Sequence, residues 1–153
     1  MKIDETIIAF DVEATSNEEL ISLLADKLCA AGYVDETYGQ ATITRETIHP
    51  TGLPTKPFPI AIPHADADGV ITSALAFASM KRPVMFCNMV EPEEELPVEL
   101  VFMIANNTPE EQVKVLRKLA TLFGDPEKLV ELKALAHSKS IMDWFEVELA
   151  HES

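Results

Sequence analysis

The architecture of this chain follows from one nearly continuous apolar run, Val98-Glu99-Leu100-Val101-Phe102-Met103-Ile104-Ala105. A strand that buries only one face alternates apolar and polar residues, whereas a strand covered on both faces is apolar almost throughout. This run is interrupted only by Glu99. It therefore predicts a buried strand in a sheet that has helices packed on both sides.

The residues after this strand predict covering helices. Pro109 starts a helix, because proline suits the first helical turn, and Gly124 ends it. Two further helices are expected over residues 126–136 and 140–150. The apolar face of the first of these helices is predicted to consist of Val113, Leu116, Ala120 and Phe123.

Helices are also expected before the strand. Ser16 stands three residues before Glu19, which is the spacing of a capping box, and leucines then recur every fourth residue until Gly32 stops the helix. A second helix is expected to be capped by Asp35 and to run to about Glu46. These two segments supply the helices of the N-terminal part of the chain.

Shorter segments complete the predicted sheet. Residues 6–12 form a short strand or an extended arm, and residues 60–62, 70–78 and 84–87 have strand character. Prolines recur within residues 49–59 and exclude regular structure there. Because helices and strands interleave from end to end, we predict an α/β fold, a three-layer domain with a mixed β-sheet flanked by helices.

Composition and charge narrow the possible partners. The 153 residues are 47% hydrophobic and 25% charged, which is typical of a globular protein of one domain. Acidic side chains number 26 against 12 basic ones, so the net charge is −14. Nucleic acid and anionic membranes require clustered Lys and Arg, and we therefore expect neither as a partner. A basic protein partner fits this charge better.

The sequence favours a cytoplasmic protein. No apolar stretch approaches the roughly 18 residues that a membrane span needs, and Asp4 and Glu5 stand where a signal peptide would carry positive charge. In that compartment we expect Cys29 and Cys87 to be buried, reduced thiols. They lie far apart in the sequence and form no metal-binding pair.

His64 is the strongest candidate for chemistry. It follows the strand predicted at residues 60–62 and then Pro63, which cannot continue a central sheet because it lacks an N–H group. The chain must leave the sheet there, so His64 lies at the carboxyl end of a strand, where open α/β sheets form ligand crevices. A histidine in an ordinary loop remains the alternative. His49 is a weaker candidate, and the histidines expected on the surface are His137 and His151.

Other catalytic arrangements have no support in the sequence. It contains no GxSxG elbow, no P-loop and no GxGxxG motif, which argues against a serine hydrolase and a nucleotide-binding enzyme. A metal site at His64, Asp66 and Asp68 would lack a recognised ligand spacing, so no metal is expected. His64 is left as a nucleophile or an acid–base group, with Arg45 as the nearest candidate partner for an anion.

These residues resemble a known family, the enzyme IIA (EIIA) domains of the bacterial sugar phosphotransferase system, fructose/mannitol superfamily. The resemblance is carried by Arg45-Glu46, Thr51-Gly52 and Ile60-Ala61-Ile62-Pro63-His64-Ala65. The spacing of residues 51–53 and the turn at residues 106–109 look most like the galactitol-type branch. The resemblance covers most of the chain and implies a single EIIA type-2 domain over residues 1–153, with the fold of that superfamily.

The resemblance implies a phosphoryl carrier. In the family, the histidine of this motif is phosphorylated on Nε2, and here it is His64. It would accept the phosphoryl group from the histidine phosphocarrier HPr and pass it to a cysteine of a cognate enzyme IIB, for uptake of galactitol or a related polyol. The membrane enzyme IIC would take part only indirectly. Arg45 would stabilise the phosphoryl charge, and no cofactor is implied because no nucleotide takes part.

Two positions depart from the family pattern. Pro57 stands where the family usually has Gly or Ala, and Glu110 stands where mannitol-type members carry a second histidine. A carboxylate there would repel phosphohistidine, so we expect Glu110 to face away or to tune the basicity of His64. Two other functions stay open. One is a regulatory, nitrogen-type EIIA-like domain that controls a non-transport partner, and the other is a non-catalytic acidic interaction module.

Two surfaces are candidates for partner binding. Phe58 and Leu53 are expected to form an apolar rim around His64, with a role in the core as the alternative. An acidic run would steer a partner that presents a basic patch, or would be only a solvated loop. This run comprises Glu91, Glu93, Glu94 and Glu95.

Overall fold

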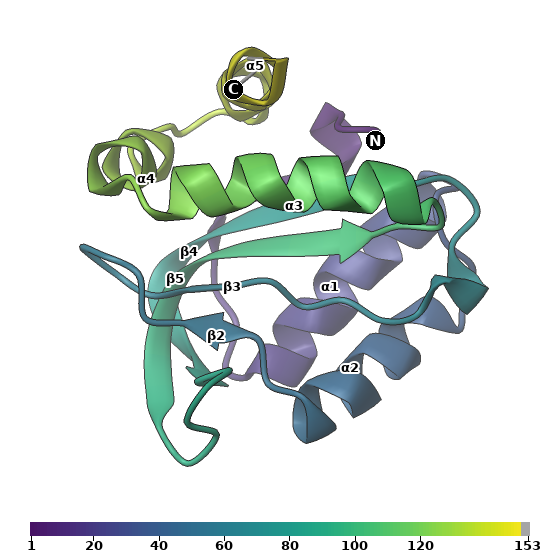
Figure 1. Ribbon diagram of the computed structural model, residues 1–153, viewed down its shortest axis with the longest axis horizontal. Coiled ribbons are helices and arrows are strands. Elements are labelled where there is room, and N and C mark those ends of the chain that lie inside the picture. Colours follow the sequence, from purple (N-terminus) through teal and green to yellow (C-terminus); the bar gives the residue numbers. More distant parts are fainter. Residues whose placement is uncertain (151–153) are drawn as a thin grey trace.

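A mixed β-sheet forms the middle layer of the structure (Figure 1), a computed structural model that describes residues 1–150. Its strands are β1 (Ile8–Val12), β2 (Gly52–Leu53), β3 (Ile60–Ala61), β4 (Ala74–Cys87) and β5 (Glu95–Ala105). Within the described residues they lie in the order β1-β4-β5-β3-β2. β1 and β4, and likewise β3 and β5, pair in parallel, whereas β4 with β5 and β2 with β3 pair antiparallel.

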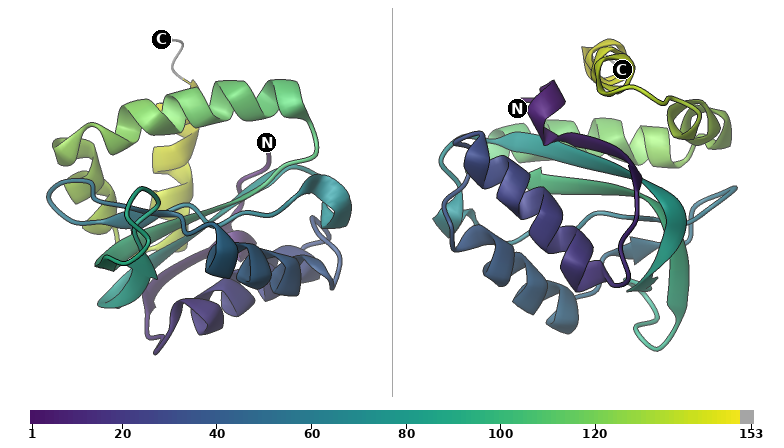
Figure 2. Two further views of the ribbon diagram at one scale, coloured as in Figure 1. Left: turned by 60° about the horizontal axis from the view of Figure 1, so that its bottom comes forward. Right: turned by 180° about the vertical axis from the view of Figure 1, so that it is seen from behind.

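Helices cover both faces of this sheet, as Figures 1 and 2 show. One face is covered by α1 (Asn17–Ala30) and α2 (Tyr38–Ile48), and the other by α3 (Pro109–Phe123), α4 (Pro126–Lys133) and α5 (Ser138–Ala150). Short 3-10 helices, η1 (Glu5–Ile7) and η2 (Ala67–Gly69), precede β1 and β4. The prediction of an α/β fold with a mixed sheet between helical layers is therefore confirmed.

Side chains on the two central strands alternate between two cores. Ala76, Ala78 and Val101 face α1 and α2, whereas Phe77 and Phe102 face α3, α4 and α5. All of them are almost completely buried, so β5 is covered on both sides as its apolar run predicts. The first half of β4 presents Ala74, Ala76 and Ala78 to the side of α1 and α2, and Leu75 and Phe77 to the opposite side.

One long strand, β4, replaces two of the predicted strands. We expected separate strands at residues 70–78 and 84–87, but the chain stays in the sheet over the whole of β4. The exposed residues 81–83 lie between the two predicted segments, and the register with β5 shifts between Ser79 and Val84. Charged residues and a proline fit such an irregularity, because the ladder of hydrogen bonds is interrupted there.

One predicted helix cap is confirmed and one is wrong. Ser16 caps α1 by accepting the backbone N–H of Glu19 at 3.1 Å, and Gly32 follows the end of α1 with a φ of +84°, which favours glycine. The N-cap of α2 is Thr37, not Asp35. Oδ1 of Asp35 instead accepts the backbone N–H of Thr37 at 2.9 Å, so Asp35 shapes the turn before the helix.

The apolar face of α3 agrees with the prediction in part, since Leu116 and Phe123 are partly buried and pack against the core. Leu119 and Leu122 are buried, whereas Val113 and Ala120, both expected on the buried face, are exposed. Apolar residues lie on more than one face of this helix, so the spacing of apolar residues alone fits two orientations of the helix on the sheet. Packing on the sheet selects the line through the two leucines.

The proline-rich segment contains a short strand. β2 lies inside residues 49–59, where we predicted no regular structure, and its Gly52 pairs with Ala61 of β3. Prolines flank β2 and do not occupy it, so none of them interrupts its pairing. Gly52 also allows a close approach of two backbones, because a Cβ atom at this position would lie 2.6 Å from the carbonyl oxygen of Cys87.

Gly52→Ala is expected to destabilise the protein by about 1–3 kcal/mol, because the new methyl group would overlap backbone atoms of Cys87. Gly124→Ala is the matched control, since a Cβ atom at Gly124 would meet nothing closer than 3.7 Å. Urea unfolding of both variants measures the difference. A Gly52→Ala protein as stable as the wild type would contradict the close approach.

The two cysteines differ in their burial. Cys29 is exposed, so the prediction of two buried thiols is wrong for this residue, and Cys87 is partly buried. Leu28, one position before Cys29, takes the place in the core. Both thiols are free within the part of the chain that the structure describes.

Among the helices of residues 1–150, none combines the length and the apolar character that a bilayer span requires.

Candidate functional site

His64 lies where two parallel strands end. It forms a bridge to Ile104 near the end of β5, and the backbone N–H of Ile104 donates to the carbonyl oxygen of Pro63 at 3.2 Å. β3 runs parallel to β5 just before His64, so both strands present their carboxyl ends at this edge of the sheet. The predicted location of His64 at the carboxyl end of a strand is therefore confirmed.

The ring of His64 is held by one of its nitrogen atoms. Nδ1 lies 2.9 Å from the carbonyl oxygen of Ile62. A carbonyl oxygen can only accept a hydrogen bond, so Nδ1 must carry the proton and donate it. In the neutral ring, the free lone pair is then on Nε2. The half-buried imidazole thus offers Nε2 as its nucleophilic atom.

Arg45 and His64 line the same small cavity, of about 210 Å³. α2 supplies Arg45, and the loop after β3 supplies His64. The structure thereby brings together, from separate elements, the two residues that the sequence singles out. The remaining lining residues are Ala65, Asp66, Ala67, Ile104, Asn106 and Asn107.

The guanidinium of Arg45 is only weakly engaged. Its Nη1 lies 3.3 Å from Oδ1 of Asp66, whose side chain is 82% exposed. An exposed ion pair of this kind contributes only about 0–1 kcal/mol. Nε of Arg45 is buried and has no hydrogen-bond partner among the described residues. Since an unsatisfied buried donor is costly, an anion bound next to Arg45 would be stabilised by it.

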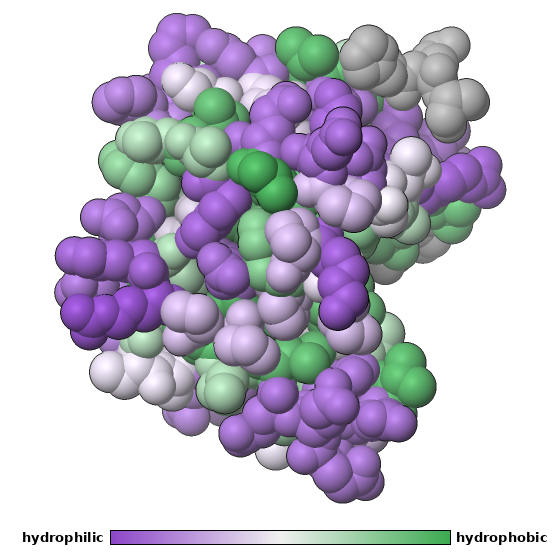
Figure 3. Space-filling view, turned by 90° about the vertical axis from the view of Figure 1, so that its left-hand side faces the viewer, coloured by the Kyte–Doolittle hydropathy of each residue, from purple (hydrophilic) through white to green (hydrophobic). Residues whose placement is uncertain are grey.

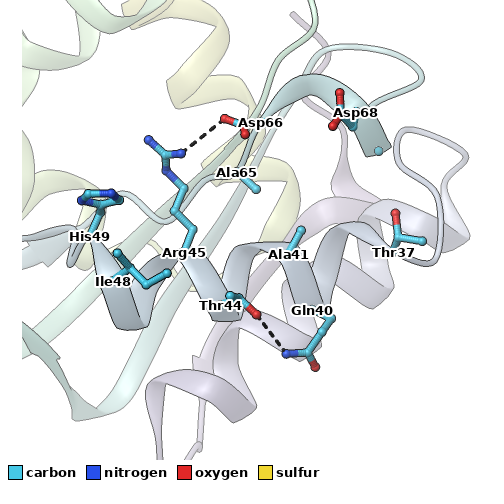
Figure 4. A pocket seen from close by; sticks show the side chains of 11 residues that line it. Thr37, Gln40, Ala41, Thr44, Arg45, Ile48, His49, Ala65, Asp66 and Asp68 are labelled. Atoms are coloured by element: carbon cyan, nitrogen blue, oxygen red, sulfur yellow. Dashed lines mark hydrogen bonds and ion pairs between the residues drawn. The ribbon is translucent and has the colours of Figure 1, made fainter.

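A larger cavity of about 800 Å³ adjoins the small one (Figure 4). One face of α2 forms its wall, and Arg45, Ala65 and Asp66 line both cavities. His49, the weaker candidate, lines the larger cavity and not the small one that contains His64. The two cavities share these three lining residues and together form a hollow surface that includes Arg45.

Of the two acidic residues after His64, only Asp66 lines the small cavity with it. Asp66 pairs with Arg45, and Asp68 lines the larger cavity. Within residues 1–150, no group of three or more His, Cys, Asp or Glu side chains is placed to hold a metal ion.

The other candidate residues lie apart from these cavities. Glu110 is exposed at the start of α3 and lines neither cavity. Phe58 is only 9% exposed and packs in the core on the side of α3, with Leu53 partly buried against the same cluster. The predicted rim role is therefore wrong for Phe58. His137 is exposed as predicted, and His151 lies outside the described residues.

Tyr38 supports the site from α2 and was not predicted. Its hydroxyl donates to the carbonyl oxygen of Ile104 at 2.8 Å and accepts the backbone N–H of Ala65 at 3.3 Å. Burial raises the pKa of this hydroxyl, which therefore remains protonated and able to donate. Tyr38 thus ties α2 both to β5 and to the loop of His64. In the sequence, an aromatic residue in the first turn of a helix indicates no more than core packing.

A network of small polar side chains lies on the β5 side of the small cavity. Oγ of Ser73 lies 2.8 Å from Oδ1 of Asn106 and accepts the backbone N–H of Asn107 at 3.1 Å. Nδ2 of Asn107 donates to the carbonyl oxygen of Ile71 at 3.1 Å. This network joins the segment before β4 to the end of β5. In the sequence, these asparagines indicate only a turn after the strand.

Glu46, the neighbour of Arg45 on α2, points into the protein. It is 6% exposed, and its Oε2 and Oε1 accept the backbone N–H and the hydroxyl of Thr51, each at 2.7 Å. Burial raises the pKa of this carboxyl group, and the hydrogen bonds from Thr51 partly offset the rise. The Arg-Glu and Thr-Gly elements of the sequence are therefore in direct contact.

Related proteins are recognisable from the sequence. The chain is 27% identical over 128 residues to the galactitol-specific EIIA component of Escherichia coli (strain K12). The aligned region covers 84% of this chain and 85% of that protein. It is 35% identical over 99 residues to the transcriptional regulator ManR of Bacillus subtilis (strain 168), and this aligned region covers 65% of this chain and 14% of the regulator. The first similarity agrees with the predicted galactitol-type branch.

A solved structure has the same fold. The complex of enzyme IIAMTL and phosphorylated enzyme IIBMTL from Escherichia coli contains a chain that is 26% identical, with a TM-score of 0.74 over 97% of each chain. The family model for the phosphoenolpyruvate-dependent sugar phosphotransferase system, EIIA 2, matches residues 1–147. The resemblance carried by the histidine motif thus extends to nearly the whole sequence, and this chain belongs to the type-2 EIIA family of the sugar phosphotransferase system.

Proposed function

We propose that this chain is a phosphoryl carrier that is phosphorylated on Nε2 of His64. The observation that carries the proposal is the 2.9 Å hydrogen bond from Nδ1 of His64 to the Ile62 carbonyl oxygen, because it leaves Nε2 unprotonated. Arg45 lines the same cavity, and its buried Nε lacks a partner among the described residues. A nucleophilic nitrogen that shares a cavity with a cation whose Nε donor is unsatisfied suits phosphoryl transfer.

The proposed transfer breaks one N–P bond and forms another. The Nε2 lone pair of His64 attacks the phosphorus atom of phosphorylated HPr, and the electrons of the breaking bond return to the HPr histidine. The transition state is loose, so positioning and charge stabilisation provide most of the catalysis. Arg45 fits the second task, since a guanidinium offers phosphate oxygens a planar set of donors and stays charged. The proton stays on Nδ1, hydrogen-bonded to the Ile62 carbonyl oxygen.

From His64 the phosphoryl group would pass to a cysteine of an enzyme IIB. The similar Escherichia coli chain occurs in a complex with phosphorylated enzyme IIB, which supports this step. The hollow surface beside Arg45 is open to a protein partner of this kind. The galactitol-specific relative favours galactitol or a related polyol as the sugar. The carrier would act in the cytoplasm and reach the membrane enzyme IIC only indirectly.

Incubation of the purified chain with phosphorylated HPr tests this function. We expect acid-labile label to appear on the chain and to move to a cysteine when the cognate enzyme IIB is added. HPr that retains all of its label in the presence of the folded chain would overturn the proposal and favour the non-catalytic acidic module.

A regulatory domain is the second candidate, and the similarity to the regulator ManR favours it. Such a domain would also take up label on His64, but it would act on a non-transport partner. The second half of the same assay separates the two functions. Label that reaches the chain and does not pass to the cognate enzyme IIB would favour regulation.

Association with HPr is expected to slow as salt rises, because a net charge of −14 attracts a partner with a basic patch. Hydrophilic side chains gather at the lower end of the face in Figure 3, where the turn between β4 and β5 lies. That turn and the start of β5 carry the exposed residues Glu91, Glu93, Glu94 and Glu95.

Stopped-flow association rates between low and physiological salt measure this effect, since the Debye length falls to about 8 Å at physiological salt. A variant in which the four glutamates are replaced by glutamine separates the acidic run from the rest of the charge. A flat salt profile of the wild type would reject electrostatic steering.

A further inference from the structure

A chain of hydrogen bonds leads from Glu46 to the ring of His64. Glu46 accepts both the backbone N–H and the hydroxyl of Thr51 at 2.7 Å. The carbonyl oxygen of Thr51 accepts the backbone N–H of Ile62 at 3.2 Å. The carbonyl oxygen of Ile62 then accepts Nδ1–H of His64 at 2.9 Å. Ile62, whose carbonyl oxygen fixes the proton on Nδ1, is thus held by Thr51. Thr51 in turn is held by Glu46.

We propose that Glu46 is a positioning residue for His64, which acts through Thr51 and Ile62 to keep the proton on Nδ1 and the lone pair on Nε2. The effect on the tautomer is independent of any reaction. Its consequence for phosphoryl transfer rests on the function proposed above.

The location of Glu46 argues for a specific role. It lies in the last turn of α2, where the negative end of the helix dipole disfavours a carboxylate. It is also buried, which disfavours its charge further. Both of its hydrogen bonds within the described residues go to Thr51. The two hydrogen bonds from Thr51, and not a contribution to helix stability, therefore explain a carboxylate at this site.

The strand geometry shows how Thr51 transmits this constraint. β2 begins directly after Thr51 and pairs antiparallel with β3, with Gly52 opposite Ala61. The hydrogen bond from Ile62 to Thr51 extends this ladder by one step toward His64. Pinning of Thr51 by Glu46 therefore sets where the ladder ends and where the Ile62 carbonyl points.

The loop is also fixed from the opposite side. The carbonyl oxygen of Pro63 accepts the backbone N–H of Ile104 on β5. Ile62 and Pro63 are thus held by neighbouring strands, one on each side of the short β3. Loss of the hydrogen bond from Ile62 to Thr51 would leave only the hydrogen bond from Ile104 on β5 to hold the loop. The Ile62 carbonyl group could then turn away from the ring of His64.

The test reads the tautomer of His64 directly, from the imidazole 15N chemical shifts of the unphosphorylated protein at a pH where the ring is neutral. The wild type is expected to show a protonated Nδ1 and an unprotonated Nε2. In Glu46→Gln only one oxygen is left to accept from the two Thr51 donors and the second hydrogen bond must reverse its direction, and in Thr51→Val the hydroxyl is lost. Both variants are expected to populate the Nε2–H tautomer.

Two further variants serve as controls. Thr51→Ser keeps both donors to Glu46 and is expected to restore the wild-type tautomer. Thr47→Val removes another hydroxyl from the last turn of α2, one that bonds only within the helix to Ile43 at 3.1 Å, and should change nothing. If Glu46→Gln does not fold, the comparison of Thr51→Val with Thr51→Ser carries the test alone.

Phosphoryl uptake from HPr is the second measurement. It is expected to fall about 10-fold in Glu46→Gln and Thr51→Val, the lower end of what the loss of a residue that orients a histidine produces. Folded variants that keep the wild-type tautomer would overturn the proposal, and so would an equal shift in Thr47→Val. A shifted tautomer in a protein whose wild type takes up no label would uphold the positioning role and refute only the proposed function.

Discussion

His64→Ala is expected to abolish uptake of label from phosphorylated HPr, because no other described histidine shares the small cavity with Arg45. Alanine lacks the Nε2 lone pair that would form the new N–P bond. The half-buried ring makes few demands on the core, so the variant should remain folded. Autoradiography after separation of the two proteins measures the loss, with circular dichroism as the check of folding.

His49→Ala is the matched control for this variant. His49 lines the adjoining cavity but lies outside the small one, and its removal should leave the label in place. Acid-labile phosphate that persists in His64→Ala would assign the phosphorylation to another residue. Loss of label in both variants would point to a general disturbance of the surface.

Arg45→Ala is expected to slow transfer by about 10- to 1,000-fold, by analogy with the loss of one electrostatic stabiliser of a transition state. Arg45→Lys should recover only part of this loss, because an ammonium group replaces the planar set of donors. Rapid-quench measurement of the transfer rate distinguishes these variants. Unchanged rates in both would show that Arg45 does not contact the phosphoryl group.

Asp66→Asn provides the control for Arg45. It removes the charge that pairs with Nη1 but leaves the guanidinium on α2. Because the pair is exposed and weak, we expect little loss of transfer, and any effect of Arg45→Ala is then due to the guanidinium itself. A loss as large as that of Arg45→Ala would instead make the ion pair the functional unit.

Much of the fold was predictable because burial leaves a plain pattern. The apolar run of β5 required cover on both faces, and Ser16 marked the start of α1. The continuity of β4 was not predictable, since the charged and proline residues at 81–83 look like a break between strands. They are tolerated because the register with β5 shifts there, which is a property of the paired strands and not of one segment.

The candidate site was predictable only in part. The proline before His64 located that residue at a strand end, because a missing N–H group has a direct structural consequence. The contacts of Tyr38, and the shared cavity of Arg45 and His64, depend on how α2 packs against the sheet. Such contacts join residues far apart in the sequence, and residue type and spacing carry little information about them.

The alanines of β4 have a consequence for the site. Arg45 belongs to the helical layer of α1 and α2, whereas His64 is held at the edge of the sheet by its bridge to Ile104, so the spacing of these layers affects the gap between the two groups. Ala76 and Ala78 lie on the face of β4 that packs against α1, the helix beside α2, and each fills this space with a single methyl group. The distance between the guanidinium and the nucleophile therefore also depends on the volume of side chains that line neither of the two cavities.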